Sequence, residues 1–247
     1  MTNEEKIIEK YFQVKALGWV VSRRRNNTGI GKTFEDYVGV VENNLDEPDL
    51  FGYEIKSHRA ISQSYVTLFT KAPSYPKGAN QILKETFGDP YPDNPNLKHL
   101  HTSMFANRFN TYKSRFSFRL RNDRENEKIV ICVYDLEHNL LDDTVGYFYD
   151  DLKSVLLEKL NKLFYVEAER DWELDKEKFF FNHARIYTTP QFDIFLDMID
   201  SGEIMYDIRI GSYKSGRNKG RAHDHGSGFR IQEHNITKLY GPAKIVD

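Results

Sequence analysis

The segment of residues 49–56 constrains the fold more than any other part of the chain, because its side chains alternate in character. Apolar Tyr53 and Ile55 alternate with charged Glu54 and Lys56. Successive side chains of a β-strand point to opposite faces, so this alternation predicts a strand with one face toward a core and one polar face. The polar face carries a carboxylate and an ammonium side by side.

Asp49 precedes this strand, and Gly52 lies between them. Glycine allows the backbone to bend there, so Asp49 can turn back toward Glu54 and bind a hard cation such as Mg²⁺ with it through oxygen atoms. The Lys56 ammonium would lie beside the attacking water and the scissile phosphate. This arrangement is typical of a metal-dependent nuclease. The pattern Asp-x4-Glu-x-Lys is short, however, and an acidic turn before a half-exposed strand is also common elsewhere.

Length and composition indicate one folded domain, residues 1–247, because 39% of the residues are hydrophobic and 14% aromatic. The N-terminal residues lack the order of a signal peptide, and no apolar run is long enough for a membrane span. We therefore expect a soluble cytoplasmic protein without membrane contact. Cys132 lies in an apolar run and is expected to be a buried thiol without a catalytic role.

The net charge of −2 hides a segregation along the chain. From Arg209 to Arg230 six residues are basic and only Asp224 is acidic. Residues 23–25 are all arginine, and residues 134–177 are strongly acidic. A surface with one positive face suits nucleic-acid binding, whereas the alternative is a set of solvated loops.

Periodicity and turn residues predict a mixed α/β (α+β) fold, with a mixed sheet flanked by helices. The second helix is expected to begin with Thr33 as its N-cap and to carry Glu35. The strands at 53–58 and 65–70 are expected to be neighbours that form the catalytic floor, and residues 88–95 are expected to form a loop. Helices are expected at 4–17, 33 to about 42, 151–163 and 191–199, and further strands at 114–121, 129–134, 165–169, 205–210 and 228–231.

Two other motifs imitate known sites. Residues 29–33, Gly-Ile-Gly-Lys-Thr, resemble the end of a phosphate-binding loop, but that motif needs glycine where the chain has Asn26. Lys32 can still approach a DNA phosphate at the start of a helix. His223 and His225 share a strand face, but zinc requires two more ligands and no set is evident. They are better suited to donate hydrogen bonds to guanine or phosphate.

Asp207 and Arg209 also share a strand face. Arginine can bind guanine O6 and N7 through two hydrogen bonds, while the carboxylate orients it or accepts from cytosine N4. An ordinary salt-bridged surface strand is the alternative.

Several multi-residue motifs occur together in this chain: Thr28–Asp36, Glu54–Lys56, Thr67–Lys71, Asp207–Gly211 and His223–Gly226. In order and spacing these motifs resemble those of the MvaI/BcnI family of Type II restriction endonucleases, over nearly the whole length of the chain.

The resemblance implies the PD-(D/E)xK restriction-endonuclease fold, with Asp49, Glu54 and Lys56 as signature residues and Glu35 as an additional acid. One or two Mg²⁺ ions would be held by Asp49, Glu54 and the Ile55 carbonyl. The chain departs from the strict signature in one respect, because Asp46 lies three positions before Asp49 and competes for the metal role.

The family further implies a monomer whose cleft clamps double-stranded DNA between a catalytic lobe, mainly 1–85 with parts of 110–200, and a recognition lobe, mainly 200–235. MvaI-like members cleave CCWGG and BcnI-like members CCSGG, leaving 5′-phosphate and 3′-hydroxyl ends. A cognate DNA methyltransferase is expected in the host. The outer C·G pairs would be contacted by Asp207, Arg209, His223, His225 and Arg230, and further DNA contacts would come from Tyr213, Lys214, Tyr65, Lys32 and Lys71.

Three alternatives stay open from the sequence. The first is a relative specific for CCSGG or CCNGG. The second is a strand-nicking repair endonuclease of the MutH type, which uses the same kind of site. The third is a DNA-binding module without catalysis, which the set Glu35, Asp49, Glu54 and Lys56 disfavours.

Overall fold

The computed structural model describes residues 1–26, 28–40, 47–59 and 65–246. The chain forms two compact units, each assembled from separate segments. Unit 1 comprises Met1–Val66, Val155–Gln191 and Glu233–Asp247, and unit 2 comprises Thr67–Ser154 and Phe192–Gln232. In the described part of the chain, no helix is long and apolar enough to cross a bilayer.

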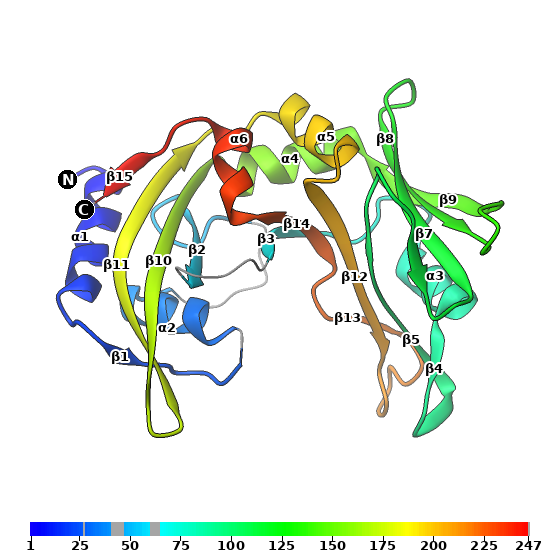
Figure 1. The fold of residues 1–247 in the computed structure, drawn as a ribbon, viewed down its shortest axis with the longest axis horizontal. Helices are drawn as coiled ribbons and strands as arrows, with labels where there is room; N and C mark the ends of the chain where they lie inside the picture. Colours follow the sequence, from blue (N-terminus) through cyan, green and yellow to red (C-terminus); the bar gives the residue numbers. More distant parts are fainter. Residues whose placement is uncertain (27, 41–46, 60–64, 247) are drawn as a thin grey trace. The chain divides into compact units, whose positions relative to one another are not determined.

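Unit 1 is built on a mixed sheet in the order β1-β11-β10-β2, with β15 also paired to β11 (Figure 1). The parallel pair is β2 with β10, in which Glu54 faces Leu163 and Lys56 faces Tyr165, and the other pairs are antiparallel. The elements of this unit are α1 (Asn3–Lys15), β1 (Val20–Val21), α2 (Gly29–Val38), β2 (Glu54–Arg59), β10 (Lys162–Glu173), β11 (Lys176–Thr188), η1 (Glu233–Asn235), α6 (Ile236–Tyr240) and β15 (Lys244–Val246).

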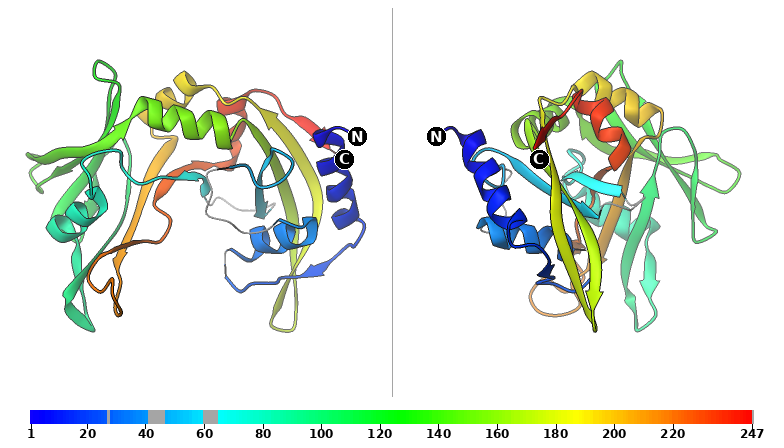
Figure 2. Two further views of the ribbon diagram at one scale, coloured as in Figure 1. Left: turned by 180° about the vertical axis from the view of Figure 1, so that it is seen from behind. Right: turned by 60° about the vertical axis from the view of Figure 1, so that its left-hand side comes forward.

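Helices α1 and α2 cover one face of this sheet with apolar side chains. Tyr11 and Phe34 are fully buried and pack with Ile55 of β2 and Phe164 of β10 in one hydrophobic core. The predicted inward direction of Ile55 is therefore confirmed, and Glu54 and Lys56 lie on the opposite face of β2. Strand β15 lies near α1 in the left view of Figure 2, and Lys244 Nζ is 2.5 Å from Glu4 Oε1.

Unit 2 contains two sheets. One has the order β3-β14-β12-β5-β4 with β13 paired to β12, and the other has the order β6-β7-β8-β9. The elements of this unit are β3 (Tyr65–Thr70), α3 (Ala79–Phe87), β4 (Asp89–Tyr91), β5 (Asn94–Met104), β6 (Asn110–Tyr112), β7 (Phe116–Asp123), β8 (Lys128–Tyr134), β9 (Leu140–Phe148), α5 (Phe192–Asp200), β12 (Ile204–Ser212), β13 (Ala222–Asp224) and β14 (Gly228–Gln232), with β3 and α4 (Tyr149–Lys159) crossing a unit boundary.

The expected pairing of the strands at 53–58 and 65–70 was wrong. Strand β3 pairs with β14 of unit 2, and the neighbour of β2 is β10. Residues 163–166 of β10 are all buried, as is usual for a strand in the interior of a sheet with a parallel neighbour. This apolar strand takes the place beside β2 that sequence proximity suggested for β3.

Several element boundaries also differ from the prediction. Helix α2 begins at Gly29, so Thr33 lies inside the helix, where its Oγ1 accepts a hydrogen bond from the Arg23 amide at 2.9 Å. A Cβ atom at Gly29 would lie 2.4 Å from the Arg24 carbonyl oxygen, so close backbone contact fixes this helix start. The segment 88–95 contains β4 and the start of β5, and Pro90 is tolerated because β4 ends the sheet.

The helix predicted at 151–163 ends at Lys159, and β10 begins at Lys162. The apolar residues of the segment 151–163 fit a helical period, but the last of them joins β10 because this strand pairs with both β11 and β2. The helix predicted to run to about residue 42 ends at Val38, because Gly39 adopts a left-handed C-cap with a φ of 90°. The competing Asp46 lies outside the described residues.

Candidate functional site

Asp49 is directed back over β2 by a tight turn. Phe51 and Gly52 both have positive φ, 52° and 80°, and the backbones of Leu50 and Tyr53 exchange hydrogen bonds of 3.1 and 2.9 Å. No atom lies within 4 Å of a Cβ built on Gly52, so its backbone conformation, rather than space, favours glycine there. The Asp49 Oδ2 atom then accepts a hydrogen bond from the Ile55 amide at 2.8 Å.

Glu54 is the most deeply buried acid of this group, with 2% of its surface exposed. Its Oε1 atom lies 2.5 Å from Lys56 Nζ. Its Oε2 atom is buried and has no hydrogen-bond partner among the described residues. Burial raises the pKa of Glu54, and the nearby Asp49 charge adds to this rise while Lys56 opposes it.

Lys56 is held as a cation by the surrounding acids. Burial alone would lower the pKa of Lys56, but the charges of Glu54, Asp49 and Glu35 outweigh it, so the pKa is raised. Glu35 on α2 therefore belongs to the same electrostatic group as the three residues at the start of β2. The structure brings together all four predicted catalytic residues within unit 1.

The donor atoms of this group fit a hard cation. The buried Glu54 Oε2 atom without a partner is costly unless a proton or metal ion satisfies it. In the described ranges no cluster of three or more His, Cys, Asp or Glu side chains is arranged to bind a metal. Two carboxylates supplemented by a backbone carbonyl and water suit Mg²⁺, which retains several water ligands.

A second polar cluster continues along the same face of the sheet, and the sequence analysis missed it. His58 Nδ1 lies 3.4 Å from Glu233 Oε2, and one Arg185 nitrogen lies 2.8 Å from Glu167 Oε1 and 3.5 Å from Glu233 Oε1. Burial, together with the hydrogen bond and charge of Glu233, raises the pKa of Glu167 to about 7. His58 follows Lys56 by two positions, which was the signal available in the sequence.

In unit 2, Asp207 holds two predicted DNA-contacting arginines. Its Oδ2 atom lies 2.7 Å from Arg209 Nε and 2.9 Å from Arg230 Nε, and Oδ1 accepts from Ser103 Oγ at 3.1 Å. Arg230 is further fixed by a hydrogen bond of 2.8 Å to Thr67 Oγ1. Arg209 is half exposed and held through Nε, which orients its guanidinium for a ligand.

The predicted histidines are part of a longer row of rings in unit 2. His223 stacks on Tyr213 with centroids 4.2 Å apart, and His225 lies 4.3 Å from His223. The row continues from His225 to His101 at 6.1 Å. From His101 it passes to His99 at 5.5 Å and ends at Tyr91, 4.7 Å further on.

His99 and His101 were not predicted as site residues. They alternate on β5, and His101 is paired with Arg209 on β12. Burial lowers the pKa of His101, and the neighbouring His99, His225 and Arg209 lower it further. Burial and His223 likewise lower the pKa of His225. The alternation was visible in the sequence, but no element was predicted for residues 96–113.

Four predicted DNA-contacting residues remain: Lys32, Lys214, Tyr65 and Lys71. Lys32 Nζ is 3.0 Å from Asp36 Oδ1 on its own helix. Lys214 Nζ is 3.0 Å from Asp93 Oδ2 and lies over the Tyr91 ring. Tyr65 begins β3, and Lys71 follows its end.

Comparison with known proteins agrees with the resemblance inferred from the sequence. The MvaI/BcnI restriction endonuclease family profile matches residues 8–240. No curated protein matched. The solved structure of the restriction endonuclease MvaI in complex with cognate DNA substrate superposes with a TM-score of 0.88 at 35% identity, covering 98% of this chain and 97% of that chain. MvaI in the absence of DNA superposes with a TM-score of 0.67 at 34% identity, covering 100% and 98%. The chain therefore belongs to the MvaI/BcnI family and is a Type II restriction endonuclease, a site-specific DNA nuclease with the restriction-endonuclease fold.

Proposed function

We propose that this protein is a monomer that cleaves both strands of duplex DNA at CCWGG, with Mg²⁺ as cofactor, and leaves 5′-phosphate and 3′-hydroxyl ends. The observation that carries the chemistry is the Asp49, Glu54 and Lys56 group, in which a buried carboxylate oxygen lacks a partner among the described residues. Similarity to MvaI, which has been solved with its cognate DNA, supports duplex DNA as the substrate.

The Asp49 and Glu54 carboxylates and the Ile55 carbonyl would hold one or two Mg²⁺ ions. When bound, Mg²⁺ supplies positive charge that favours ionisation of the attacking water and stabilises the charge that develops on the phosphate. The hydrogen bond from the Ile55 amide orients the Asp49 carboxylate for this role.

Lys56 positions the attacking water and offsets negative charge at the scissile phosphate. Its pKa is raised by the three acids despite burial, so it is a cation at the pH of the reaction. An ammonium without acceptor capacity can orient an attacking oxygen by donation and can stabilise the pentavalent phosphate electrostatically. Glu35 maintains that positive charge from α2.

Sequence recognition is proposed for unit 2. Asp207 fixes Arg209 and Arg230, which suits them to bind guanines of the outer C·G pairs through paired hydrogen bonds. His223 and His225 add contacts to these pairs, and Tyr213, Lys214, Tyr65, Lys32 and Lys71 contact neighbouring groups or phosphates. The recognition lobe proposed at mainly 200–235 belongs largely to unit 2, which also contains Thr67–Ser154, whereas the proposed catalytic residues belong to unit 1.

The test is digestion of a sequenced supercoiled plasmid with Mg²⁺, followed by run-off sequencing of the ends. Linear product cut at every CCWGG site is expected, and methylation by the cognate methyltransferase of the host should block it. Cutting at CCSGG or CCNGG would change the assigned site. Stable nicked circles without linear product would indicate a strand-nicking repair enzyme, and no cleavage of any duplex would overturn the proposal.

A further inference from the structure

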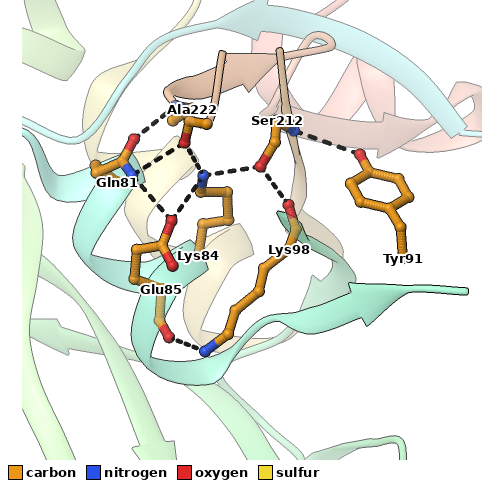
Figure 3. Close-up of polar contacts among 8 residues, drawn as sticks. Gln81, Lys84, Glu85, Tyr91, Lys98, Ser212 and Ala222 are labelled. Atoms are coloured by element: carbon orange, nitrogen blue, oxygen red, sulfur yellow. Dashed lines mark hydrogen bonds and ion pairs between the residues drawn. The ribbon is translucent and has the colours of Figure 1, made fainter. Parts of the chain in front are cut away.

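Lys84 on α3 is a lysine whose side chain is completely buried. Its ammonium has three donor hydrogens, and three acceptors surround it in Figure 3: Ser212 Oγ at 2.8 Å, the Gly220 carbonyl oxygen at 2.7 Å and Glu85 Oε1 at 2.9 Å. Two hydrogen bonds and one ion pair hold the ammonium, and no part of the side chain is exposed to a ligand. Lys84 therefore cannot contact DNA directly.

The three partners come from different parts of unit 2. Glu85 lies on α3, Ser212 ends β12, and Gly220 precedes β13. A buried cation is tolerated only when its hydrogen bonds are complete, so loss of either contact outside α3 leaves an expensive unpaired donor. Lys84 thus ties both ends of the segment between β12 and β13 to one helix.

Neighbouring side chains complete the same attachment (Figure 3). Gln81 Oε1 accepts from the Ala222 amide at 2.6 Å, and Gln81 Nε2 donates to the Gly220 carbonyl at 3.3 Å. Ser212 Oγ donates to the Lys98 carbonyl at 2.6 Å while it accepts from Lys84. The segment Ser212–Ala222, which we name the recognition hairpin, is therefore fixed at its base from α3 and from β5.

The recognition hairpin carries all four basic side chains between β12 and β13, and all four are exposed. It closes on itself through hydrogen bonds from the Tyr213 amide to the Arg221 carbonyl, 3.0 Å, and from the Gly220 amide to the Tyr213 carbonyl, 2.9 Å. Tyr213 also stacks on His223 just beyond the hairpin. Its exposed side chains that suit DNA are Tyr213, Lys214, Arg217, Lys219 and Arg221.

We propose that Lys84 is a positioning residue for sequence discrimination, which holds the recognition hairpin in its DNA-contacting conformation through Ser212 and Gly220. The inference rests on the proposed function of unit 2 in DNA recognition. Chemistry resides in unit 1, so loss of Lys84 lowers the preference for the cognate site and leaves turnover of bound cognate DNA unchanged.

The primary variant is Lys84→Met, which keeps the length of the side chain and removes its charge and donors. We expect the ratio of kcat/KM for the cognate site to that for a site with one changed outer base pair to fall about ten-fold, close to the loss of one base contact. The kcat at saturating cognate DNA should stay within about two-fold of the parent. Lys219→Met removes a charge from the hairpin surface and should weaken all DNA alike, without changing the ratio.

Ser212→Ala tests the same attachment of the recognition hairpin to Lys84, with a smaller change to the core. If Lys84 acts through Ser212, the double variant should discriminate no worse than Lys84→Met alone, because the two effects are coupled. Additive losses would overturn this connection. An unchanged ratio in Lys84→Met, or a fall of kcat in proportion to a loss of folded protein, would overturn the proposal.

Trypsin digestion gives a measurement that does not require DNA. The hairpin contains Lys214, Arg217, Lys219 and Arg221 as cleavage sites. These bonds should be cut several-fold faster in Lys84→Met and Ser212→Ala than in the parent, at temperatures where unit 1 stays intact. Equal rates would refute a positioning role even if the parent enzyme cleaves DNA as proposed. Faster digestion in a protein that fails to cleave CCWGG would instead place the error in the proposed function.

Discussion

The Oδ2 atom of Asp49 lies 2.8 Å from the backbone nitrogen of Ile55 and accepts its hydrogen bond. This contact holds the carboxylate beside Glu54, although the two residues are separated by a turn with two positive φ values. The position of Asp49 is thus set by an uncharged donor, the Ile55 amide, whereas its proposed role depends on the charge of the carboxylate. A substitution can separate these two properties.

Asp49→Asn keeps an acceptor for the Ile55 amide and removes the charge. We expect cleavage to fall by at least about 10²–10³-fold, with melting temperature and specific DNA binding nearly unchanged. Asp49→Ala should show the same catalytic loss and cost about 1 kcal/mol more in stability. Single-turnover cleavage and binding titrations with Ca²⁺ in place of Mg²⁺ measure the two properties. Parallel loss of binding would indicate a structural role instead.

Lys56→Met should also reduce cleavage by about 10²–10³-fold while specific binding is retained. The variant removes the cation 2.5 Å from the buried Glu54 carboxylate. Lys159→Met is a matched control, because the charge of Lys159 also lowers the pKa of Glu54 but only from a distance. The control should cleave within about three-fold of the parent under the same single-turnover conditions, and equal losses in both variants would exclude a specific role for Lys56.

Mg²⁺ should stabilise the folded protein without DNA, because it satisfies the buried Glu54 Oε2 atom. At a concentration about five times the Kd, the expected gain is about 1 kcal/mol, or about 2–4 °C in melting temperature. Differential scanning fluorimetry with and without chelator measures it. The gain should disappear in Asp49→Asn, and a shift of equal size in that variant would place the metal elsewhere.

Arg209→Ala should lose about 1–3 kcal/mol of discrimination at one base pair. Asp207→Ala should affect more than one position, because its Oδ2 atom holds both Arg209 and Arg230. Competition binding against duplexes with each base pair changed in turn gives the position-specific losses. A uniform weakening for every duplex would show that these arginines contact phosphates only.

Glu167→Gln should change how stability depends on pH. The pKa of Glu167 is raised from 4.5 to about 7 by burial and by Glu233, so between these values the folded state holds a proton that the unfolded state has released. The contribution of Glu167 to the free energy of unfolding is complete below pH 4.5 and is lost as pH rises through about 7. Glutamine does not titrate, so relative to the parent the variant should gain roughly 1–2 kcal/mol between pH 5 and 8 after solvent screening.

Chemical denaturation across that pH range provides the measurement for Glu167→Gln.

Glu233 contributes to stability with the opposite pH dependence. Burial raises the pKa of Glu233, but hydrogen bonds from His58 and Glu167 outweigh this effect and lower the pKa to about 2. Its stabilisation is therefore present above pH 4.5 and lost only as pH falls toward 2. A parallel pH dependence in parent and variant would contradict the raised pKa of Glu167.

Local sequence patterns predicted those elements of the fold that are determined by neighbouring residues. The alternation of Tyr53, Glu54, Ile55 and Lys56 predicted β2 and its two faces, and the order of motifs predicted the family. The position of β10 beside β2 could not be predicted in this way, because parallel pairing between distant segments leaves no local pattern in either strand.

Other errors came from tertiary contacts that override local preference. The glycine and proline residues of 88–95 predicted a loop, yet an edge strand accommodates them. No element was predicted for residues 96–113, so the alternating His99 and His101 on β5 were not recognised. The burial of Lys84 has no signal in the local sequence, because a lysine on an amphipathic helix is normally exposed. Its burial depends on Ser212 and Gly220, which lie far along the chain.

The parallel pairing of β2 with β10 also has a consequence for how the enzyme is synthesised. Among the described strands β2 pairs with β10 alone, and a ribosome translates residues 67–154 before it reaches β10. We therefore expect that chains released early by premature termination carry β2 without its partner and cannot cut the chromosome of the cell that makes them.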